Sequence, residues 1–286
     1  MGSHFKETYT RYTLLIIGLI VVLLGVSLMT SFFGSKAEHH SKGGIPSGSA
    51  VVSQCRGIYY GDFLPTIVNA KLLPKTQELC NPAYAVMHSG ISRTPLWSAE
   101  HLMRHSKNEK ADRTNDFRAD ERLGSDQRAE LEDYARSGYD RGHMSPSADF
   151  TTSDDVSQSF LLSNMVPQNP TNNRGLWSAI EGATRHLANT QGELYVITGP
   201  LFTGESLQRL NGRVLVPTML YKAIYDPKSG QAAAYVVHNQ EGDSYEVVSL
   251  EKLEALAGIV LFPTLSPHVK ASVMSLPQPL MKNGFR

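Results

Sequence analysis

The sequence predicts an α+β domain that begins near residue 51 and ends near residue 272. The chain has 286 residues, which is enough for one large domain or two small ones with a sizeable core. Apolar residues make up 41% and charged residues 19%, an ordinary globular mixture. From residue 51 onward, strand-like and helix-like segments alternate with no internal repeat and no second linker. We therefore expect one domain over residues 51–272, followed by a tail over residues 273–286.

An apolar segment precedes this domain. Residues 14–33, LLIIGLIVVLLGVSLMTSFF, contain no charge and follow a polar stretch, residues 1–13, that includes Lys6 and Arg11. This length can span a bilayer as a helix, and basic residues before the helix favour a cytoplasmic N-terminus with the rest exported. A cleaved signal sequence is the alternative. The length favours an uncleaved transmembrane anchor.

The two cysteines fit an exported domain. Residues 34–50, GSKAEHHSKGGIPSGSA, have the composition of a flexible linker. Cys55 and Cys80 follow it, and an even pair in an oxidising compartment indicates a disulfide. Two buried free thiols are the alternative interpretation. A zinc site is disfavoured because no CxxC spacing accompanies the cysteines.

Hydrophobic periodicity and turn residues predict the helices and strands of the domain along the chain. Residues 172–192 start at an Asn and end at a Gly, both of which are common at helix ends, and Ser249 can cap a later helix. Residues 104–136 carry charges of both signs and are interpreted as a solvated surface. Residues 83–102 are predicted to form an extended segment, a Gly turn and then a strand that leads toward a helix. The other predicted strand segments are 160–168, 193–202, 213–226 and 231–239, and the predicted helices are 172–192 and 250–262.

The tetrapeptide DRGH, residues 140–143, carries groups suited to catalysis. His143 can serve as a general base near neutral pH, and Arg141 can bind a phosphate with two donors or bridge to a carboxylate. Gly142 lets the backbone pass close to another group, and Asp140 can hold a loop or a partner in place. A surface turn that happens to contain a histidine is the alternative.

A second group lies on the helix predicted over residues 172–192. Asn173, Trp177 and Glu181 are four residues apart and share one helix face, with Arg185 at its margin. The amide oxygen of Asn173 suits Mg²⁺, and Glu181 can hold a water of that ion. The alternatives are a helix cap for Asn173 and an exposed ion pair between Glu181 and Arg185. We expect Trp177 to be a packing anchor.

Together the two groups resemble a known family. DRGH, then SNMVPQNPTNNRGLWSAIE over residues 163–181, is similar to the DNA/RNA non-specific endonucleases, which are ββα-metal or His-Me finger nucleases. SRTPLW at 92–97, LYVITGPLF at 194–202 and VPTMLYKAIYD at 216–226 agree with it. The resemblance covers roughly residues 51–265. It implies a central antiparallel sheet flanked by helices.

The resemblance implies a role for each matching residue. His143 is the general base for the attacking water. Asn173 is the direct protein ligand of Mg²⁺, with Mn²⁺ as a substitute, and Glu181 orders metal-bound water. Arg93 is the phosphate or transition-state clamp. Arg141 is a further catalytic or phosphate-binding candidate.

The remaining assignments are supporting ones. Arg185 and Asp140 bind the substrate or hold other residues of the site in position. Asn164 is structural and fixes the loop near the site.

These expectations define an exported, metal-dependent endonuclease that cuts DNA and RNA with little sequence preference. The net charge of zero offers no global argument for a nucleic-acid partner and does not exclude a local basic groove. One alternative is a phosphodiesterase on a smaller phosphate, and another is a membrane-anchored nucleic-acid-binding or DNA-uptake component. Residues 14–33 make the membrane a partner if they are not cleaved. An inhibitor or a homodimer cannot be read from the sequence.

Overall fold

The computed structural model describes residues 50–104 and 111–281, which belong to one compact unit, Gly48–Arg286. The predicted anchor at 14–33, the polar stretch before it and nearly all of the linker lie outside these residues. Within the described ranges, no helix is long and apolar enough to cross a membrane.

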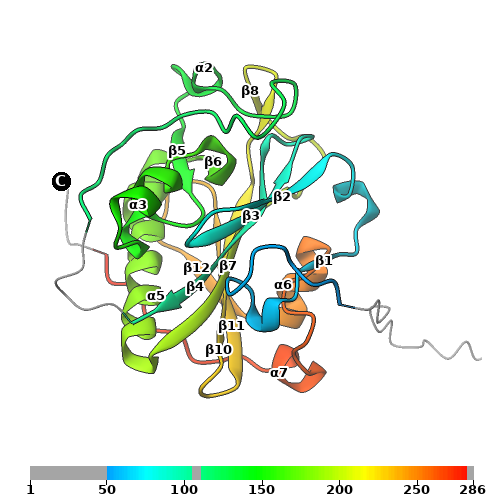
Figure 1. Cartoon of the computed structure of the whole chain (residues 1–286), viewed down its shortest axis with the longest axis vertical. Helices are drawn as coiled ribbons and strands as arrows, with labels where there is room; N and C mark the ends of the chain where they lie inside the picture. The colour runs from blue at the N-terminus through cyan, green and yellow to red at the C-terminus, as the bar shows by residue number, and fades with distance from the viewer. Residues whose placement is uncertain (1–49, 105–110, 282–286) are drawn as a thin grey trace, which may run out of the picture. The chain divides into compact units, whose positions relative to one another are not determined.

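A seven-stranded antiparallel sheet forms the centre of the domain (Figure 1). Each strand pairs only antiparallel neighbours, as the resemblance implied. In spatial order the strands are β12 (Tyr245–Val248), β11 (Gln231–His238), β10 (Met219–Asp226), β7 (Glu193–Leu201), β4 (Thr94–Met103), β3 (Tyr84–Ser89) and β2 (Thr76–Cys80).

Short strand pairs and 3₁₀ turns lie around this sheet. One pair forms from the DRGH segment and the strand after it. The pairs are β1 (Thr66–Ile67) with β13 (Ile259–Val260), β5 (Asp140–His143) with β6 (Met165–Gln168), and β8 (Arg209–Leu210) with β9 (Val214–Leu215). The 3₁₀ turns are η1 (Tyr60–Asp62), η2 (Ala70–Leu72), η3 (Ser147–Asp149) and η4 (Leu162–Asn164).

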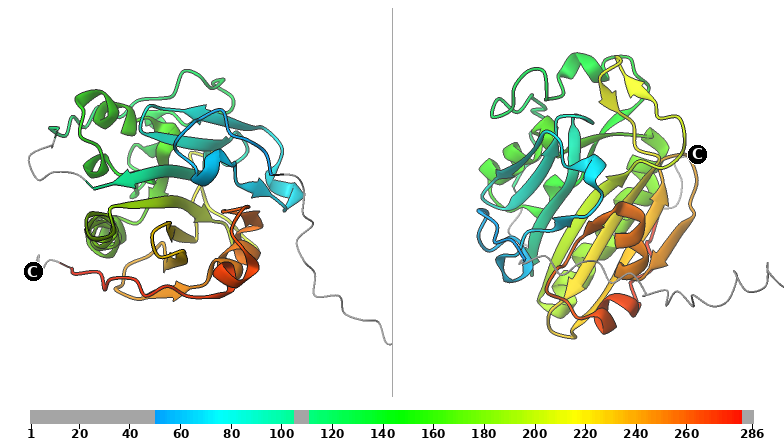
Figure 2. Two further views of the ribbon diagram at one scale, coloured as in Figure 1. Left: turned by 60° about the horizontal axis from the view of Figure 1, so that its bottom comes forward. Right: turned by 90° about the vertical axis from the view of Figure 1, so that its right-hand side faces the viewer.

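Helices cover both faces of the sheet (Figures 1 and 2). The helix α5 packs on one face, and α6 with α7 pack on the other. The helical segments are α2 (Leu131–Tyr134), α3 (Ser153–Ser159), α4 (Pro170–Asn172), the π-helical turn η5 (Asn173–Trp177), α5 (Ser178–Gln191), α6 (Leu250–Ala257) and α7 (Pro267–Ala271).

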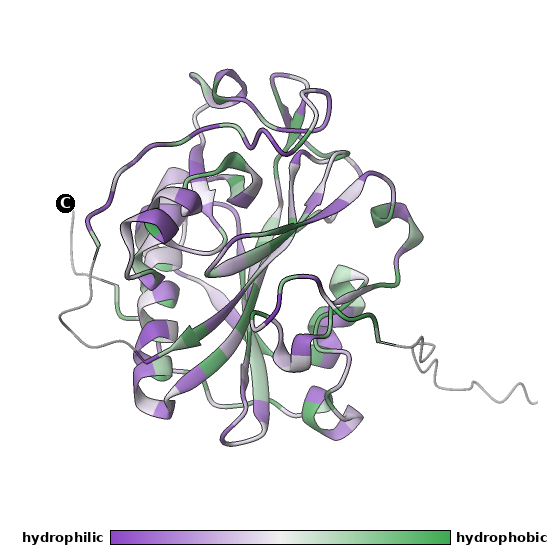
Figure 3. Cartoon of the chain, in the orientation of Figure 1, coloured by the Kyte–Doolittle hydropathy of each residue, from purple (hydrophilic) through white to green (hydrophobic). Residues whose placement is uncertain are grey.

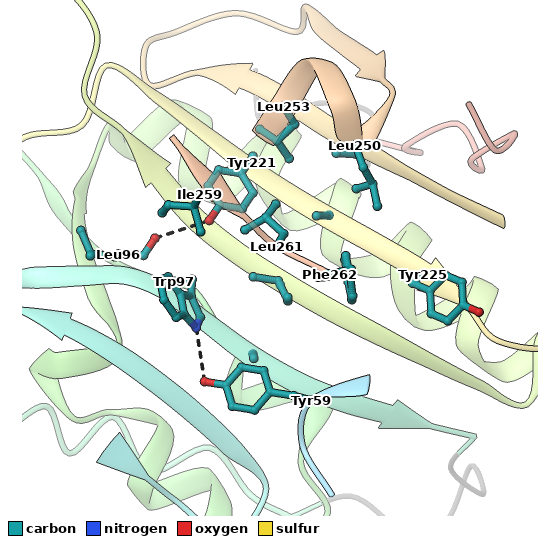
Figure 4. Packing of buried hydrophobic residues seen from close by; sticks show 14 of the residues in the cluster. Tyr59, Leu96, Trp97, Tyr221, Tyr225, Leu250, Leu253, Ile259, Leu261 and Phe262 are labelled. Atoms are coloured by element: carbon teal, nitrogen blue, oxygen red, sulfur yellow. Dashed lines mark hydrogen bonds between the residues drawn. The ribbon is translucent and has the colours of Figure 1, made fainter. Parts of the chain in front are cut away.

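Alternating side chains on the strands build two hydrophobic cores. On β10, Tyr221, Ala223 and Tyr225 face the core under α6, whereas Leu220 and Ile224 face the core under α5. In the first core the indole N–H of Trp97 donates to the Tyr59 hydroxyl, and the Tyr221 hydroxyl donates to the Leu96 carbonyl (Figure 4). Each buried polar group there therefore has a partner.

The core under α5 continues into the C-terminal residues. Figure 3 shows hydrophobic strands in the sheet and hydrophilic residues along α5, as expected for an amphipathic helix. Met274 is 7% exposed and its N–H donates to the Ala232 carbonyl. The Tyr235 hydroxyl donates to the Pro277 carbonyl. Residues after α7 therefore pack against β11.

Several local expectations can be compared with these elements. The predicted cap of α6 is confirmed, because the Ser249 hydroxyl accepts from the Lys252 N–H at 3.2 Å. The predicted strand over 160–168 is wrong in its first half, where η4 turns the chain before β6 begins. The predicted helix over 172–192 begins two residues earlier, at Pro170, and is interrupted by the π-helical turn.

The structure contains the predicted disulfide between Cys55 and Cys80. The bridge joins the segment before η1 to the end of β2, an edge strand of the sheet. Its sequence separation is 25 residues, for which the chain-entropy model gives about 3 to 4 kcal/mol of stabilisation.

Candidate active site

The DRGH segment is a strand, not a turn. It forms β5, and Gly142 and His143 pair with Val166 and Met165 of β6. A side-chain carbon on Gly142 would lie 2.0 Å from Oε1 of Gln168. The glycine is therefore required by the close approach of Gln168, and not by a positive φ or by contact with substrate.

Gln168 also connects β6 to the helical segment that follows. Its amide nitrogen donates to Oδ1 of Asn172 at 2.9 Å, and the amide nitrogen of Asn172 donates to the His238 carbonyl at 3.3 Å. The side chain of Asn169 caps α4 by accepting from the Asn172 N–H. These amide contacts place the next residue, Asn173, beside β5.

Asn173 is not a helix cap. It lies inside the π-helical turn η5 with right-handed helical backbone angles. A π-helical turn shifts side chains out of ordinary helical register and is frequent at functional sites. The Nδ2 of Asn173 donates to Oδ2 of Asp140 at 2.9 Å, so the amide is oriented by the first residue of DRGH.

Asp140 is also held in place by Arg174. The guanidinium donates to both carboxylate oxygens, at 2.9 Å and 2.7 Å. Burial alone would raise the pKa of Asp140, but the hydrogen bonds from Arg174 and Asn173 outweigh it and hold that pKa below its usual value. An ionised Asp140 keeps the amide N–H₂ of Asn173 as a donor, which leaves the amide oxygen as the group that can bind a cation.

His143 is enclosed by aromatic rings. Its ring centroid is 4.9 Å from that of Phe160 and 5.7 Å from that of Phe117. Within the described residues, Nε2 has no hydrogen-bond partner. Burial, with a contribution from Arg113, lowers the pKa of His143 to about 3. The imidazole is therefore neutral at physiological pH, the state in which it can accept a proton.

Glu181 and Arg185 both line the cavity that His143 and Asn173 line. Arg185 pairs with the buried carboxylate of Asp149 at 2.6 Å, so its partner comes from η3 and the alternative of an exposed ion pair with Glu181 is not observed among the described residues. Burial raises the pKa of Glu181 to about 7, although Arg185 acts to lower it. A carboxyl group that titrates near neutrality can change protonation state during a reaction.

The cavity has a volume of about 390 Å³ and opens to solvent beside β5 and α5. Its lining combines an imidazole, an amide, carboxylates and several guanidinium groups. The lining residues are Arg113, Phe117, Asp140, Arg141, His143, Pro146, Ser147, Ala148, Asn173, Arg174, Ser178, Glu181 and Arg185.

Arg141 and Asn164 lie at the cavity and beside it. Arg141 lines the cavity, and its guanidinium carbon lies 4.2 Å from the ring centroid of Phe117. Asn164 is fully buried; it accepts from the Ser145 N–H and donates to the Ser145 and Ser159 carbonyls. These contacts hold the turn that follows His143.

Arg93 is not brought to the cavity. It lies in the turn between β3 and β4 with a φ of 58°, and its guanidinium donates to the Arg128 carbonyl at 3.5 Å. Arg113 lines the cavity instead, with its guanidinium carbon 5.2 Å from the ring centroid of Phe160. Arg113 lies in the charge-rich stretch interpreted as solvated surface, where balanced charges give no signal that singles it out.

The different positions of these arginines give a test. We expect Arg113→Ala to lower kcat/KM for plasmid cleavage by about 10- to 100-fold, because it removes a cation next to His143. The matched Arg93→Ala should stay within about threefold of wild type, a change of well under 1 kcal/mol. Steady-state cleavage rates measure both, and the reverse order would restore Arg93 as the phosphate clamp.

The donor set fits a hydrated Mg²⁺ ion. Mg²⁺ keeps several waters and takes few protein ligands, so one oriented amide oxygen with nearby carboxylates is sufficient. The oxygen of Asn173 is the ligand that the Asp140 contact leaves available. Among the described residues, no group of three His, Cys, Asp or Glu side chains is placed to hold a metal ion.

Comparisons with known proteins show which family matches the chain. The sequence model of the DNA/RNA non-specific endonuclease family matches residues 66–268. The chain is 34% identical over 223 residues to a nuclease of Nostoc sp., covering 72% of this chain and 80% of that protein. It is 37% identical over 204 residues to the mitochondrial nuclease EXOG of Danio rerio, covering 64% of this chain and 60% of that protein.

A solved structure shows the same fold. A chain in the crystal structure of the EndoG/EndoGI complex matches with a TM-score of 0.63 and 30% sequence identity. The match covers 67% of this chain and 88% of that chain.

The fold and the comparisons define the class first: the protein is a nuclease, a hydrolase that acts as an endonuclease on nucleic acids. Within that class, the chain belongs to the DNA/RNA non-specific endonuclease family.

Proposed function

We propose that the protein is an exported, metal-dependent endonuclease that hydrolyses phosphodiester bonds of DNA and RNA with little sequence preference. The observation that carries the proposal is the meeting of His143, Asn173 and Glu181 around one cavity of about 390 Å³. A neutral base, a cation ligand and a carboxylate are the groups that hydrolysis of a phosphodiester by water needs.

His143 is the general base in this proposal. Its neutral imidazole takes a proton from the water that attacks phosphorus, and Phe117 and Phe160 keep the ring in place. Arg113 and Arg185 place positive charge beside the phosphate oxygens as negative charge develops on them.

Asn173 is the proposed ligand of Mg²⁺, with Mn²⁺ as a substitute. Asp140 orients its amide, and Glu181 is placed to accept a hydrogen bond from a water of the ion. When bound there, Mg²⁺ supplies positive charge for the scissile phosphate and for the leaving 3′-oxygen. The products are then a 5′-phosphate and a 3′-hydroxyl.

The weak sequence preference follows from the cavity lining. Four arginines line the cavity, namely Arg113, Arg141, Arg174 and Arg185, and guanidinium groups bind backbone phosphates that every sequence shares. Binding through phosphates weakens as salt concentration rises. We therefore propose that DNA and RNA are both substrates and that activity falls at high ionic strength.

Export is supported by the sequence and by the disulfide. A disulfide such as Cys55–Cys80 persists in oxidising compartments outside the cytoplasm. The apolar residues 14–33 provide the anchor or the signal sequence. We place the nuclease domain in the periplasm or the extracellular space, bound to the membrane or released by cleavage. An inhibitor protein is a candidate partner because the solved relative is a complex described as showing EndoG inhibition.

A cleavage assay tests the proposal. The purified protein is incubated with Mg²⁺ and either plasmid DNA or a long single-stranded RNA, and product size is followed with time. We expect both polymers to be cut internally, at rates within about tenfold of each other, since the cavity binds phosphates and not bases. Binding without cleavage under every divalent cation tried would contradict the enzyme and favour the uptake component. Cleavage of small phosphodiesters alone would favour the other alternative.

A further inference from the structure

A lysine is buried under the helix that carries the candidate site. Lys222 lies in the middle of β10 and is 0% exposed. Its strand neighbours on the same face, Leu220 and Ile224, belong to the core under α5. Burying an ammonium group is costly unless its surroundings compensate it, so its presence at the centre of the sheet calls for a reason.

The contacts of Lys222 connect three strands of the sheet to the helical segment that carries Asn173 and Glu181. Its Nζ donates to Oγ1 of Thr198 on β7 at 2.7 Å and lies 3.9 Å from Oε1 of Glu100 on β4. The same Nζ lies 5.7 Å from the ring centroid of Trp177. Trp177 is the last residue of the π-helical turn that begins at Asn173. The ammonium group therefore stabilises that turn through its contact with the indole ring of Trp177.

Glu181 follows Trp177 by one helical turn and lies on the same face of the helix. The positive groups near Glu181 differ in how they are held. Arg185 pairs with Asp149 and Arg113 comes from an exposed segment, whereas Lys222 is buried within the sheet. The charged and titratable groups around Glu181, from every element packed there, are Arg113, Asp149, Arg185, Lys222, Glu100 and His143.

We propose that Lys222 is a positioning residue of the nuclease reaction: held by Thr198, its ammonium group supports the turn from Asn173 to Trp177 and gives the carboxylate of Glu181 a fixed positive neighbour. This inference rests on the proposed function, because it concerns the same site. Lys222 touches neither substrate nor metal and acts only through the helix.

The electrostatic surroundings of Glu181 support this role. Burial raises its pKa to about 7, and the positive charges of Arg185 and Lys222 oppose that rise. The carboxylate form is present above this pKa and is lost as pH falls through it. Loss of the Lys222 charge should therefore move the acid limb of the activity profile to higher pH.

The test compares full-length wild type, Lys222→Met, Lys222→Arg and a matched control, Lys270→Met. Lys270 is also largely buried against a carboxylate, with Nζ 3.0 Å from Glu254, but it lies in α7 on the other face of the sheet. kcat and KM are measured from pH 5 to pH 9 in Mg²⁺ with plasmid DNA, together with the melting temperature.

We expect Lys222→Met to move the acid limb up by about one pH unit, which is about a tenfold loss of kcat below the limb. KM should be unchanged, and Lys222→Arg should keep the limb near its wild-type position. Lys270→Met should lower the melting temperature without moving the limb. A purely structural lysine would lower the melting temperature alone, and an unmoved limb in Lys222→Met would overturn the inference.

A second variant covers the case in which Lys222→Met does not fold. Thr198→Val keeps the shape of the side chain and removes the acceptor of the Lys222 ammonium. We expect a fall in kcat of about threefold or more with KM unchanged, and a wild-type kcat would overturn the inference. If wild type itself does not cut nucleic acid, the proposed function fails; if wild type cuts and these variants match it, only the role of Lys222 fails.

Discussion

His143→Ala should lower kcat for plasmid cleavage by about 1,000-fold, because a positioned general base contributes about 10²- to 10⁴-fold. A water molecule should replace the missing imidazole only inefficiently, because the ring is buried and lies close to Phe117 and Phe160. Burial keeps the imidazole neutral with a pKa of about 3, so the wild-type base is available at all pH values above that range. Initial rates in Mg²⁺ measure the effect.

A second histidine provides the control for this prediction. His101 lies in β4, outside the candidate cavity, and its Nε2 lies 2.6 Å from a carboxylate oxygen of Glu193. His101→Ala should keep kcat close to wild type. Retention of more than about a tenth of wild-type kcat by His143→Ala, when the control is active, would remove His143 from the role of base.

Asn173→Ala should lower cleavage by about 100-fold or more at low Mg²⁺, and chelation of divalent cations should abolish cleavage by wild type. A cation at a scissile phosphate contributes several kcal/mol, and Asn173 is the side chain proposed to hold it. Asp140→Asn should have a related, smaller effect, because Asp140 only orients the Asn173 amide through the 2.9 Å hydrogen bond. Titration of activity with Mg²⁺ should show a higher requirement in both variants.

Asn69→Ala is the matched control for the loss of an amide. Asn69 caps η2 by accepting from the Lys71 N–H at 3.1 Å and lies outside the candidate cavity. Its Mg²⁺ requirement should equal that of wild type. Equal Mg²⁺ requirements in wild type and Asn173→Ala would show that the cation is held elsewhere. Direct binding measured by calorimetry without substrate should give the same order of affinities.

The sequence allowed much of the site to be predicted because its parts are local. A spacing of four residues predicts that Asn173, Trp177 and Glu181 lie near one helix face. In the structure Asn173 and Glu181 line the cavity, whereas Trp177, at the end of the π-helical turn, is buried in the core under α5. The segment DRGH keeps Asp140 and His143 three residues apart whatever the rest of the chain does. Both segments line the cavity, as the resemblance implied.

The sequence assigned the phosphate-clamp role to Arg93, whereas in the structure Arg113 lines the cavity, and this difference has a physical reason. Arg93 precedes a strong strand and belongs to a recognisable short motif, but the turn before β4 directs it toward the Arg128 carbonyl. Arg113 sits among charges of both signs, where composition indicates only a solvated surface. Its approach to Phe160 and the cavity depends on how a long connection packs across α3 and β5.

The sequence by itself determined the cysteine pair, the α+β class and the spacing of the candidate site residues within each of the two segments. These features depend on residue type and on short-range periodicity, which a single chain displays directly. The family and its antiparallel sheet followed from the resemblance of the motifs. Only the tertiary structure decided which charged groups surround the site: Arg113 in place of Arg93, Asp149 as the partner of Arg185, and Lys222 against the ring of Trp177. Electrostatic interactions depend on distance and burial in the folded chain, and neither quantity is contained in sequence separation.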